Sequence, residues 1–133
     1  MEIRSAERNL ILVISRADLL IPSGIRVNAS GTKLYVTDSS ATDSFPSFRG
    51  AGATGSPVIF VYDLDDDAFP VNKYMLWLSR SGIPDGIHID DANRICTGEF
   101  EEVVVRNSQG KVLGLFNSEA ISAKGGRTSP ISR

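Results

Sequence analysis

A short segment of this chain occurs twice, and the repetition constrains the fold more than any other feature. The segment Pro22-Ser23-Gly24-Ile25-Arg26-Val27-Asn28 returns 62 residues later, at position 84, as Pro84-Asp85-Gly86-Ile87-His88-Ile89-Asp90. Each copy is followed by a turn and three further apolar stretches. A four-strand unit written twice indicates a radially repeated all-β protein, in which each unit needs neighbours to bury its faces. Such proteins place function on the loops that open each unit, which here begin at Ser23 and Asp85.

Alternating apolar residues predict the strands of both units. After the opening segments, we expect strands at 31–38, 58–62 and 73–78 in the first unit, and at 92–98, 102–106 and 111–116 in the second. Residues 29–32 are expected to form a tight hairpin turn. We also expect the two proline-glycine corners, at Pro22 and Pro84, to lie side by side around a common axis.

The remaining segments flank or interrupt the two units, which span residues 22–117. Residues 39–57 are rich in Ser, Ala, Thr and Gly, and are expected to form a long surface loop. Residues 1–21 are interpreted as a remnant of a preceding unit or a lead-in, with a short helix over 16–20 as the competing interpretation. The polar, basic residues 118–133 are expected to be a disordered tail.

Composition bounds the class of protein. The chain has 133 residues, 41% of them hydrophobic and 23% charged, as in a single globular domain. A net charge of -2 gives no sign of the basic surface with which proteins bind nucleic acid or an anionic membrane. The longest apolar runs are far shorter than the ~20 residues of a membrane-spanning helix. No signal peptide is visible at the start, which slightly favours a cytoplasmic location. Cys96 is the single cysteine, which excludes an internal disulfide.

The order and spacing of these pieces resemble one family, the gluconolactonase family, also called the senescence marker protein or regucalcin family. The likeness is greatest to its fungal lactonohydrolase-like members. The matching pieces are Pro22-Ser23-Gly24-Ile25, residues 31–38, Val61-Tyr62-Asp63-Leu64-Asp65, Ile83-Pro84-Asp85-Gly86-Ile87-His88-Ile89-Asp90 and Gly110-Lys111-Val112-Leu113-Gly114. The resemblance implies a six-bladed β-propeller, of which this chain holds a fragment: about two four-stranded blades plus part of a third.

The resemblance also implies a metal site and an activity. The family binds a divalent metal, often calcium, at the top of the central channel and hydrolyses sugar lactones. Its ligands are an early Glu, an Asn in a P-N-G loop and an Asp in a P-D-G loop. The Asp matches Asp85, whereas the Asn position holds Ser23, a shorter and weaker oxygen donor; no counterpart of the early Glu is visible. Asp85 is therefore the expected metal ligand and general base, and Ser23 the second expected ligand.

Each candidate residue also has a structural interpretation. Asp85 is equally suited to a turn after proline. Asp38 is expected either near the channel or as the cap of a turn. His88, the only histidine, should point opposite to its two neighbours in a strand and could approach the channel, although a lone histidine is more often structural. Cys96 is expected to be a buried small hydrophobe.

Two functions follow from these observations. The first is a calcium-dependent sugar-lactone hydrolase, incomplete in this chain, whose partner is a small-molecule lactone. The alternative is a catalytically inactive, truncated propeller fragment or binding module. A partial propeller leaves strand edges unpaired, and these are expected to permit self-association.

Overall fold

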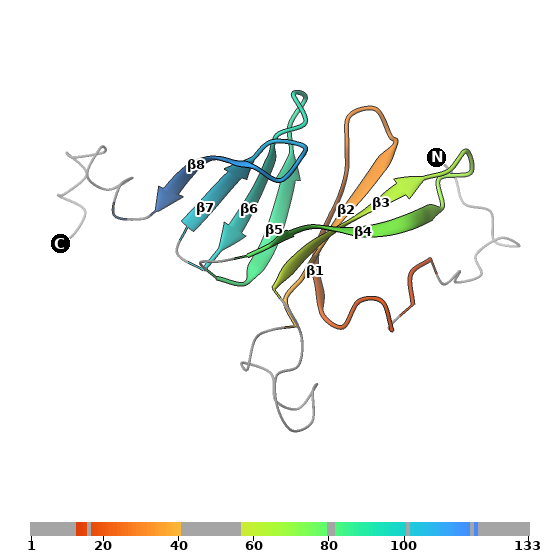
Figure 1. Cartoon of the computed structure of the whole chain (residues 1–133), viewed down its shortest axis with the longest axis horizontal. Coiled ribbons are helices and arrows are strands. Elements are labelled where there is room, and N and C mark those ends of the chain that lie inside the picture. The colour runs from red at the N-terminus through yellow and green to blue at the C-terminus, as the bar shows by residue number, and fades with distance from the viewer. Residues whose placement is uncertain are drawn as a thin grey trace, which may run out of the picture.

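Eight strands in two sheets make up the fold (Figure 1). The computed structural model describes residues 13–15, 17–40, 57–79, 82–100, 102–117 and 119 of the chain. Both sheets are four-stranded and antiparallel, and in each the strands lie in the order of the sequence. The predicted all-β architecture of two repeated four-strand units is therefore confirmed.

The first sheet, here called blade 1, contains β1 (Pro22–Val27), β2 (Lys33–Asp38), β3 (Val58–Leu64) and β4 (Pro70–Leu78). The second sheet, blade 2, contains β5 (Pro84–Ile89), β6 (Ile95–Glu99), β7 (Glu102–Arg106) and β8 (Val112–Asn117). The bounds follow the alternating pattern of the sequence closely. The largest differences are that β4 begins at Pro70 rather than at residue 73, and that β6 begins at Ile95 rather than at residue 92.

The same turn chemistry closes the first hairpin of each blade. In blade 1 the Asn28 side-chain oxygen accepts hydrogen bonds from the backbone N–H groups of Thr32 and Lys33. In blade 2 the Asp90 carboxylate accepts bonds from the N–H groups of Ala92 and Arg94. Such side-chain acceptors stabilise tight turns locally. The turn predicted at residues 29–32 is confirmed. Both hairpins use an Asn or Asp acceptor at the start of the turn, although the first turn is one residue longer.

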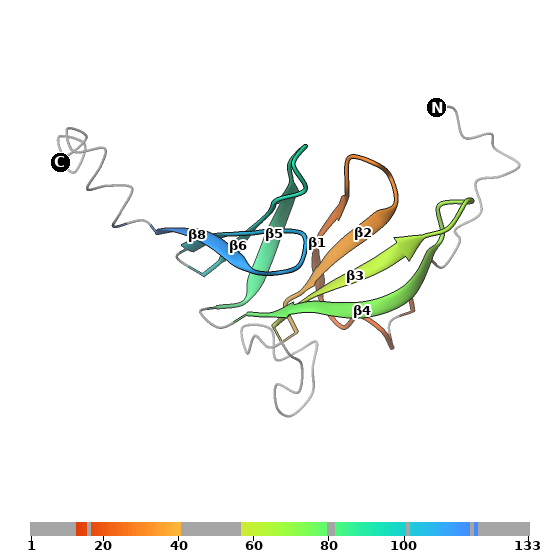
Figure 2. The same cartoon turned by 45° about the horizontal axis from the view of Figure 1, so that its top comes forward.

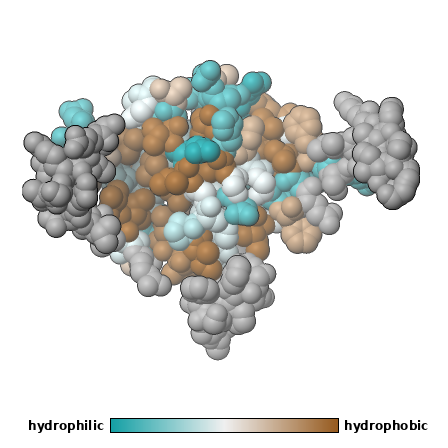
Figure 3. Space-filling model, turned by 180° about the vertical axis from the view of Figure 1, so that it is seen from behind, coloured by the Kyte–Doolittle hydropathy of each residue, from teal (hydrophilic) through white to brown (hydrophobic). Residues whose placement is uncertain are grey.

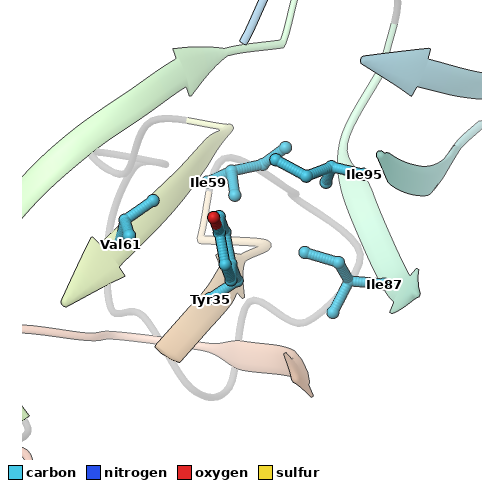
Figure 4. Close-up of a cluster of buried hydrophobic side chains, with 5 residues drawn as sticks. All are labelled: Tyr35, Ile59, Val61, Ile87 and Ile95. Atoms are coloured by element: carbon cyan, nitrogen blue, oxygen red, sulfur yellow. The ribbon is translucent and has the colours of Figure 1, made fainter. Parts of the chain in front are cut away.

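The hydrophobic core lies between the two sheets (Figure 4). Side chains from the two blades point toward one another there: Tyr35, Ile59 and Val61 from blade 1, and Ile87 and Ile95 from blade 2. Trp77 of β4 packs at the margin of this cluster. Complete burial of one such aliphatic side chain stabilises a fold by about 1.5–3 kcal/mol. The two blades therefore bury their hydrophobic faces against each other.

A second cluster covers the other face of blade 1. There Leu19 packs on Leu34, Val36 and Tyr62, all buried. Residues 17–19 form a single turn in which the Leu19 N–H donates to the Ser15 carbonyl at 3.3 Å. This turn stands where a helix over residues 16–20 was the competing prediction.

Several predictions fall on parts of the chain that the structure leaves undescribed. Most of the expected remnant of a preceding unit (residues 1–12), most of the expected loop (41–56) and nearly all of the expected tail (118 and 120–133) lie outside the described residues. Within the described residues, no helix is long and apolar enough to cross a membrane.

Candidate functional site

The two proline-glycine corners lie side by side, as predicted. They open β1 and β5, the strands at which the two blades contact each other (Figure 2). Ser23 and Asp85 occupy equivalent positions in them, one residue after Pro22 and Pro84. The repeat therefore brings the two predicted ligand positions to one junction, although they are 62 residues apart in the sequence, 23 against 85.

Three hydroxyl groups of blade 1 hold this junction together. Ser23 Oγ and Ser39 Oγ donate to the carbonyl oxygen of Pro84 at 3.2 and 2.7 Å, and Thr37 Oγ1 donates to that of Asp85 at 2.6 Å. We call Ser23, Thr37 and Ser39 the hydroxyl clasp. Because its acceptors are backbone carbonyls, the clasp depends on the path of β5 and not on the identity of its side chains.

Gly24 permits the close approach of the two strands. A Cβ atom at this position would lie 2.7 Å from the carbonyl oxygen of Asp85 and 2.9 Å from Thr37 Oγ1. Real Cβ atoms essentially never approach backbone oxygens so closely, so a larger residue would push the blades apart. The glycine of the first corner is thus explained by the position of the second corner.

The Asp85 side chain is exposed and, among the described residues, has no hydrogen-bond or ion-pair partner. It is a free carboxylate at the junction. Ser23 differs, because its Oγ lies 2.5 Å from Ser39 Oγ and 3.0 Å from Thr37 Oγ1 in addition to the Pro84 carbonyl. A hydroxyl has one hydrogen and two lone pairs, so three polar neighbours leave the Ser23 oxygen little capacity for a further ligand.

The described residues do not form a complete calcium site. Calcium takes about 6–8 oxygen ligands, commonly from several carboxylates. No group of three or more His, Cys, Asp or Glu side chains that could hold a metal ion occurs within the described part of the chain. Asp85 would supply one carboxylate and Ser23 one hydroxyl oxygen, so the junction offers a partial set of donors.

Asp38 and His88 have structural surroundings. The Asp38 carboxylate is buried and accepts hydrogen bonds from the backbone N–H groups of Leu20, Ile21 and Ser40 at 3.1, 3.2 and 2.9 Å. It therefore caps the chain around the corner, which was one of its two predicted roles. His88 is exposed while its neighbour Ile87 is buried, as the alternation of a strand predicts.

Cys96 was predicted to be buried, and that prediction is wrong. It pairs with His88 across β5 and β6, on the face of blade 2 that points away from blade 1, and it is only half-buried. That face lacks a covering sheet among the described residues.

A buried charged network in blade 2 was missed by the sequence reasoning. Arg106 Nη1 lies 2.5 Å from Glu99 Oε1 and 2.8 Å from Thr97 Oγ1, and Ser79 Oγ lies 2.5 Å from Glu99 Oε2. Glu99 is 0% and Arg106 1% exposed. Burial raises the pKa of Glu99, but the hydrogen bonds from Arg106, Ser79 and Thr97 outweigh it and leave the pKa below its usual value.

The signal for this network was the alternation of β7. Arg106 follows the buried Val104 by two residues and so points to the same, inward face. An arginine there requires an acidic partner, because an unpaired buried charge is very costly. The register pairs Arg106 with Ile95 and Glu99 with Glu102, so the two charged residues lie at opposite ends of this strand pair. The Arg106 side chain reaches Glu99 along β6, past Thr97.

Comparison with known proteins finds similar solved structures. No protein-family model matches the sequence, and no curated protein matches it. Several solved structures do match. One is a gluconolactonase from Xanthomonas campestris, with 21% identity, a TM-score of 0.57, and coverage of 75% of this chain and 29% of that protein. Another is a luciferin-regenerating enzyme, with 19% identity, a TM-score of 0.59, and coverage of 75% and 31%.

At these identities the likeness establishes the fold. The chain folds as two consecutive four-stranded blades like those of the β-propellers that it resembles, which confirms the predicted fold class and the resemblance in fold. It spans less than a third of the length of either similar protein, since they are covered to 29% and 31%.

Proposed function

We propose that this chain is part of a sugar-lactone hydrolase that uses a divalent cation, with calcium as the expected ion. The observation that carries the proposal is the exposed, unpartnered carboxylate of Asp85 at the junction of two blades. The fold supports it, because one of the similar structures is named as a gluconolactonase. The remaining ligands would come from outside the described residues.

The proposed role of Asp85 follows from its surroundings. A free carboxylate can bind a hard cation through one oxygen and accept a proton from water through the other. In lactone hydrolysis, water adds to the ester carbonyl carbon, the ring C–O bond breaks, and the proton taken from water passes to the departing alkoxide. A bound divalent cation would polarise that carbonyl. The clasp holds the backbone carbonyl of Asp85, so the main chain that carries the carboxylate is anchored.

Ser23 would contribute less. When its single hydrogen is donated to the Pro84 carbonyl, the lone pairs of its oxygen remain available to a cation. A hydroxyl is a weaker metal ligand than the amide oxygen of Asn, and the Ser39 and Thr37 oxygens, at 2.5 and 3.0 Å, leave little room beside the Ser23 oxygen. We therefore expect Asp85 to dominate any metal affinity at this junction.

The second candidate is a non-catalytic fragment or binding module. It is favoured by two observations: the donor set is incomplete within the described residues, and Ser23 already serves in the clasp. In this case Asp85 would be only the middle residue of a Pro-Asp-Gly corner.

Hydrolysis of a sugar lactone decides between the two. The rate is followed with a pH indicator and corrected for spontaneous hydrolysis, with added Ca²⁺, with a chelator, and for Asp85→Asn. We expect a calcium-dependent rate that the chelator abolishes and that Asp85→Asn lowers about 100-fold or more. Asp91→Asn is the matched control, because Asp91 is also an exposed Asp of the same hairpin. The absence of any metal-dependent rate would favour the non-catalytic candidate.

A further inference from the structure

We propose that this chain associates with a second copy of itself head to tail, the outer face of blade 2 of one copy docking on the outer face of blade 1 of the other. The outer face is the one that points away from the partner blade within the chain. The inference is independent of the proposed function. It rests on the internal repeat. The face of blade 1 that contacts blade 2 has a counterpart on the outer face of blade 2, and the face of blade 2 that contacts blade 1 has a counterpart on the outer face of blade 1.

The strand registers identify the counterpart of each interface residue. Arg26 pairs with Tyr35, and its repeat counterpart His88 pairs with Cys96, so Tyr35 and Cys96 are equivalent. The same comparison continues across each sheet. Tyr35 pairs with Val61 as Cys96 pairs with Val105, so Val61 corresponds to Val105. Thr37 pairs with Ile59 as Gly98 pairs with Val103, so Ile59 corresponds to Val103, and the next pairings make Trp77 correspond to Phe116. The surface that blade 1 presents to blade 2 therefore recurs on blade 2 as Cys96, Val103, Val105 and Phe116.

These counterparts are apolar and uncovered. Val103 is 42% and Phe116 53% exposed, and Leu113 beside them is 55% exposed. Leu113 and Phe116 line a hollow of about 380 Å³ together with Cys96, Val105 and Gly114, and the Asp90–Arg94 ion pair borders it. In blade 1 the equivalent positions are buried or partly buried by blade 2. Contiguous apolar surface of this kind marks an interaction site.

The complementary surface is the outer face of blade 1. Blade 2 presents Ile87 and Ile89 of β5 to blade 1, and their counterparts in β1 are Ile25 and Val27, which are 59% and 47% exposed. Ile25 lines an apolar hollow of about 490 Å³ together with Leu19 and other residues. Figure 3 shows that apolar side chains occupy much of the molecular surface seen from behind.

Leu19 already covers part of this face. It packs on Leu34 and Val36, so that the exposed apolar groups left for a second copy are fewer than in the internal interface. They are Leu20, Ile25, Val27 and Met75. We therefore expect docking to be weaker than the internal contact and to depend on protein concentration.

Gly86 is an independent sign of a missing neighbour. Its counterpart Gly24 must be glycine, because the carbonyl of Asp85 lies against it. At Gly86 nothing lies within 4 Å of an added Cβ, and the backbone φ is outside the left-handed region. Neither space nor conformation in a single copy requires glycine there. In the proposed contact, a corner of the second copy approaches Gly86 as Asp85 approaches Gly24.

The partner that fits is a second copy of the chain. The outer face of blade 2 resembles the surface of blade 1 that binds blade 2, and the outer face of blade 1 resembles the surface of blade 2 that binds blade 1. Such a contact is heterologous: it uses two different surfaces and generates rings or open chains rather than a closed two-fold dimer. It also differs from association through strand edges, since sheet faces and not backbone groups meet.

Sedimentation velocity over a range of concentrations tests the proposal. We expect wild type to associate, and we expect Phe116→Glu and Ile25→Glu each to be monomeric, because each places a charge in one face. An equimolar mixture of the two variants should form heterodimers and nothing larger, since one intact face of each kind remains. Gly86→Ala should weaken association without lowering the free energy of unfolding of the monomer.

Leu115→Glu is the matched control. Leu115 is next to Phe116 in β8 and is 55% exposed, but it lines the hollow on the side of Trp77, toward blade 1. It should associate as wild type does. Circular dichroism checks that all variants remain folded, and Val103→Glu and Val27→Glu replace any that do not. A monomeric wild type at all concentrations would overturn the proposal, as would association that Phe116→Glu abolishes while Ile25→Glu leaves it intact.

Discussion

Thr37 Oγ1 lies 2.6 Å from the carbonyl oxygen of Asp85 and donates a hydrogen bond to it. Thr37 is fully buried, with 0% of its surface exposed. The residue with the free carboxylate is thus held by its backbone from the neighbouring blade. The position of Asp85 and the stability of the blade junction consequently depend on the same contact.

Replacing Thr37 with Val tests this contact. The variant keeps the shape of the side chain but removes the donor, which leaves the Asp85 carbonyl without that hydrogen bond. We expect the free energy of unfolding to fall by about 1–3 kcal/mol, measured by urea denaturation. Thr32→Val, in an exposed turn, is the control and should change it far less. An unaffected Thr37→Val protein would show that the hydroxyl adds nothing to the junction.

Gly24→Ala and Gly86→Ala form a matched pair. An added Cβ at Gly24 would lie 2.7 Å from the Asp85 carbonyl oxygen, whereas Gly86 has nothing within 4 Å. We expect Gly24→Ala to destabilise the chain by about 1–3 kcal/mol through overpacking. Gly86→Ala should leave the unfolding midpoint of the monomer unchanged or slightly raised. Equal effects of the two substitutions would contradict the close approach of β1 and β5.

Glu99→Gln removes the charge that balances Arg106. Breaking a buried ion pair by removing one partner costs about 3–5 kcal/mol, because the other charge stays buried. We expect a loss of that order in the free energy of unfolding. Asp66→Asn, in the exposed turn between β3 and β4, is the control and should change little. A near-neutral Glu99→Gln would mean that water reaches Arg106.

The same network predicts acid sensitivity. The pKa of Glu99 in the folded chain lies below its ordinary value of 4.5, so the unfolded chain binds the proton more readily. The stabilisation is complete above that ordinary value and is lost as pH falls through the folded pKa. Unfolding midpoints measured from about pH 6 down to about pH 3 should therefore fall more steeply for wild type than for Glu99→Gln. Parallel curves would exclude Glu99 as a source of the acid sensitivity.

Thermal unfolding with and without Ca²⁺ separates metal binding from catalysis. Asp85→Asn should not change stability in the absence of the ion, because the carboxylate has no partner among the described residues. If Asp85 binds the ion, Ca²⁺ should raise the unfolding temperature of wild type and do so much less for Asp85→Asn. Asp91→Asn should respond as wild type does. An equal rise in all three proteins would place any bound ion elsewhere.

The strands and their turns were predictable because their signals are local. Alternation over five to nine residues and the Asn28 and Asp90 turns act within a few positions of the chain, so they can be recognised without knowing the fold. The repeat then implied that the corners at Ser23 and Asp85 meet, because equivalent units pack in equivalent ways. Nothing local, however, distinguished an exposed carboxylate at Asp85 from an engaged one.

The sequence by itself determined two four-stranded units and the positions of their corners, through periodicity and turn chemistry. Only the tertiary structure decided which polar groups bond to one another: Ser23 bonds to the Pro84 carbonyl in the clasp, and Arg106 pairs with Glu99 in the core. Those assignments depend on atoms that are far apart along the chain and meet only when two sheets pack. Hydrogen bonds are short-range and directional, and a buried charge needs a partner within reach, so these partners are settled by packing and not by sequence pattern.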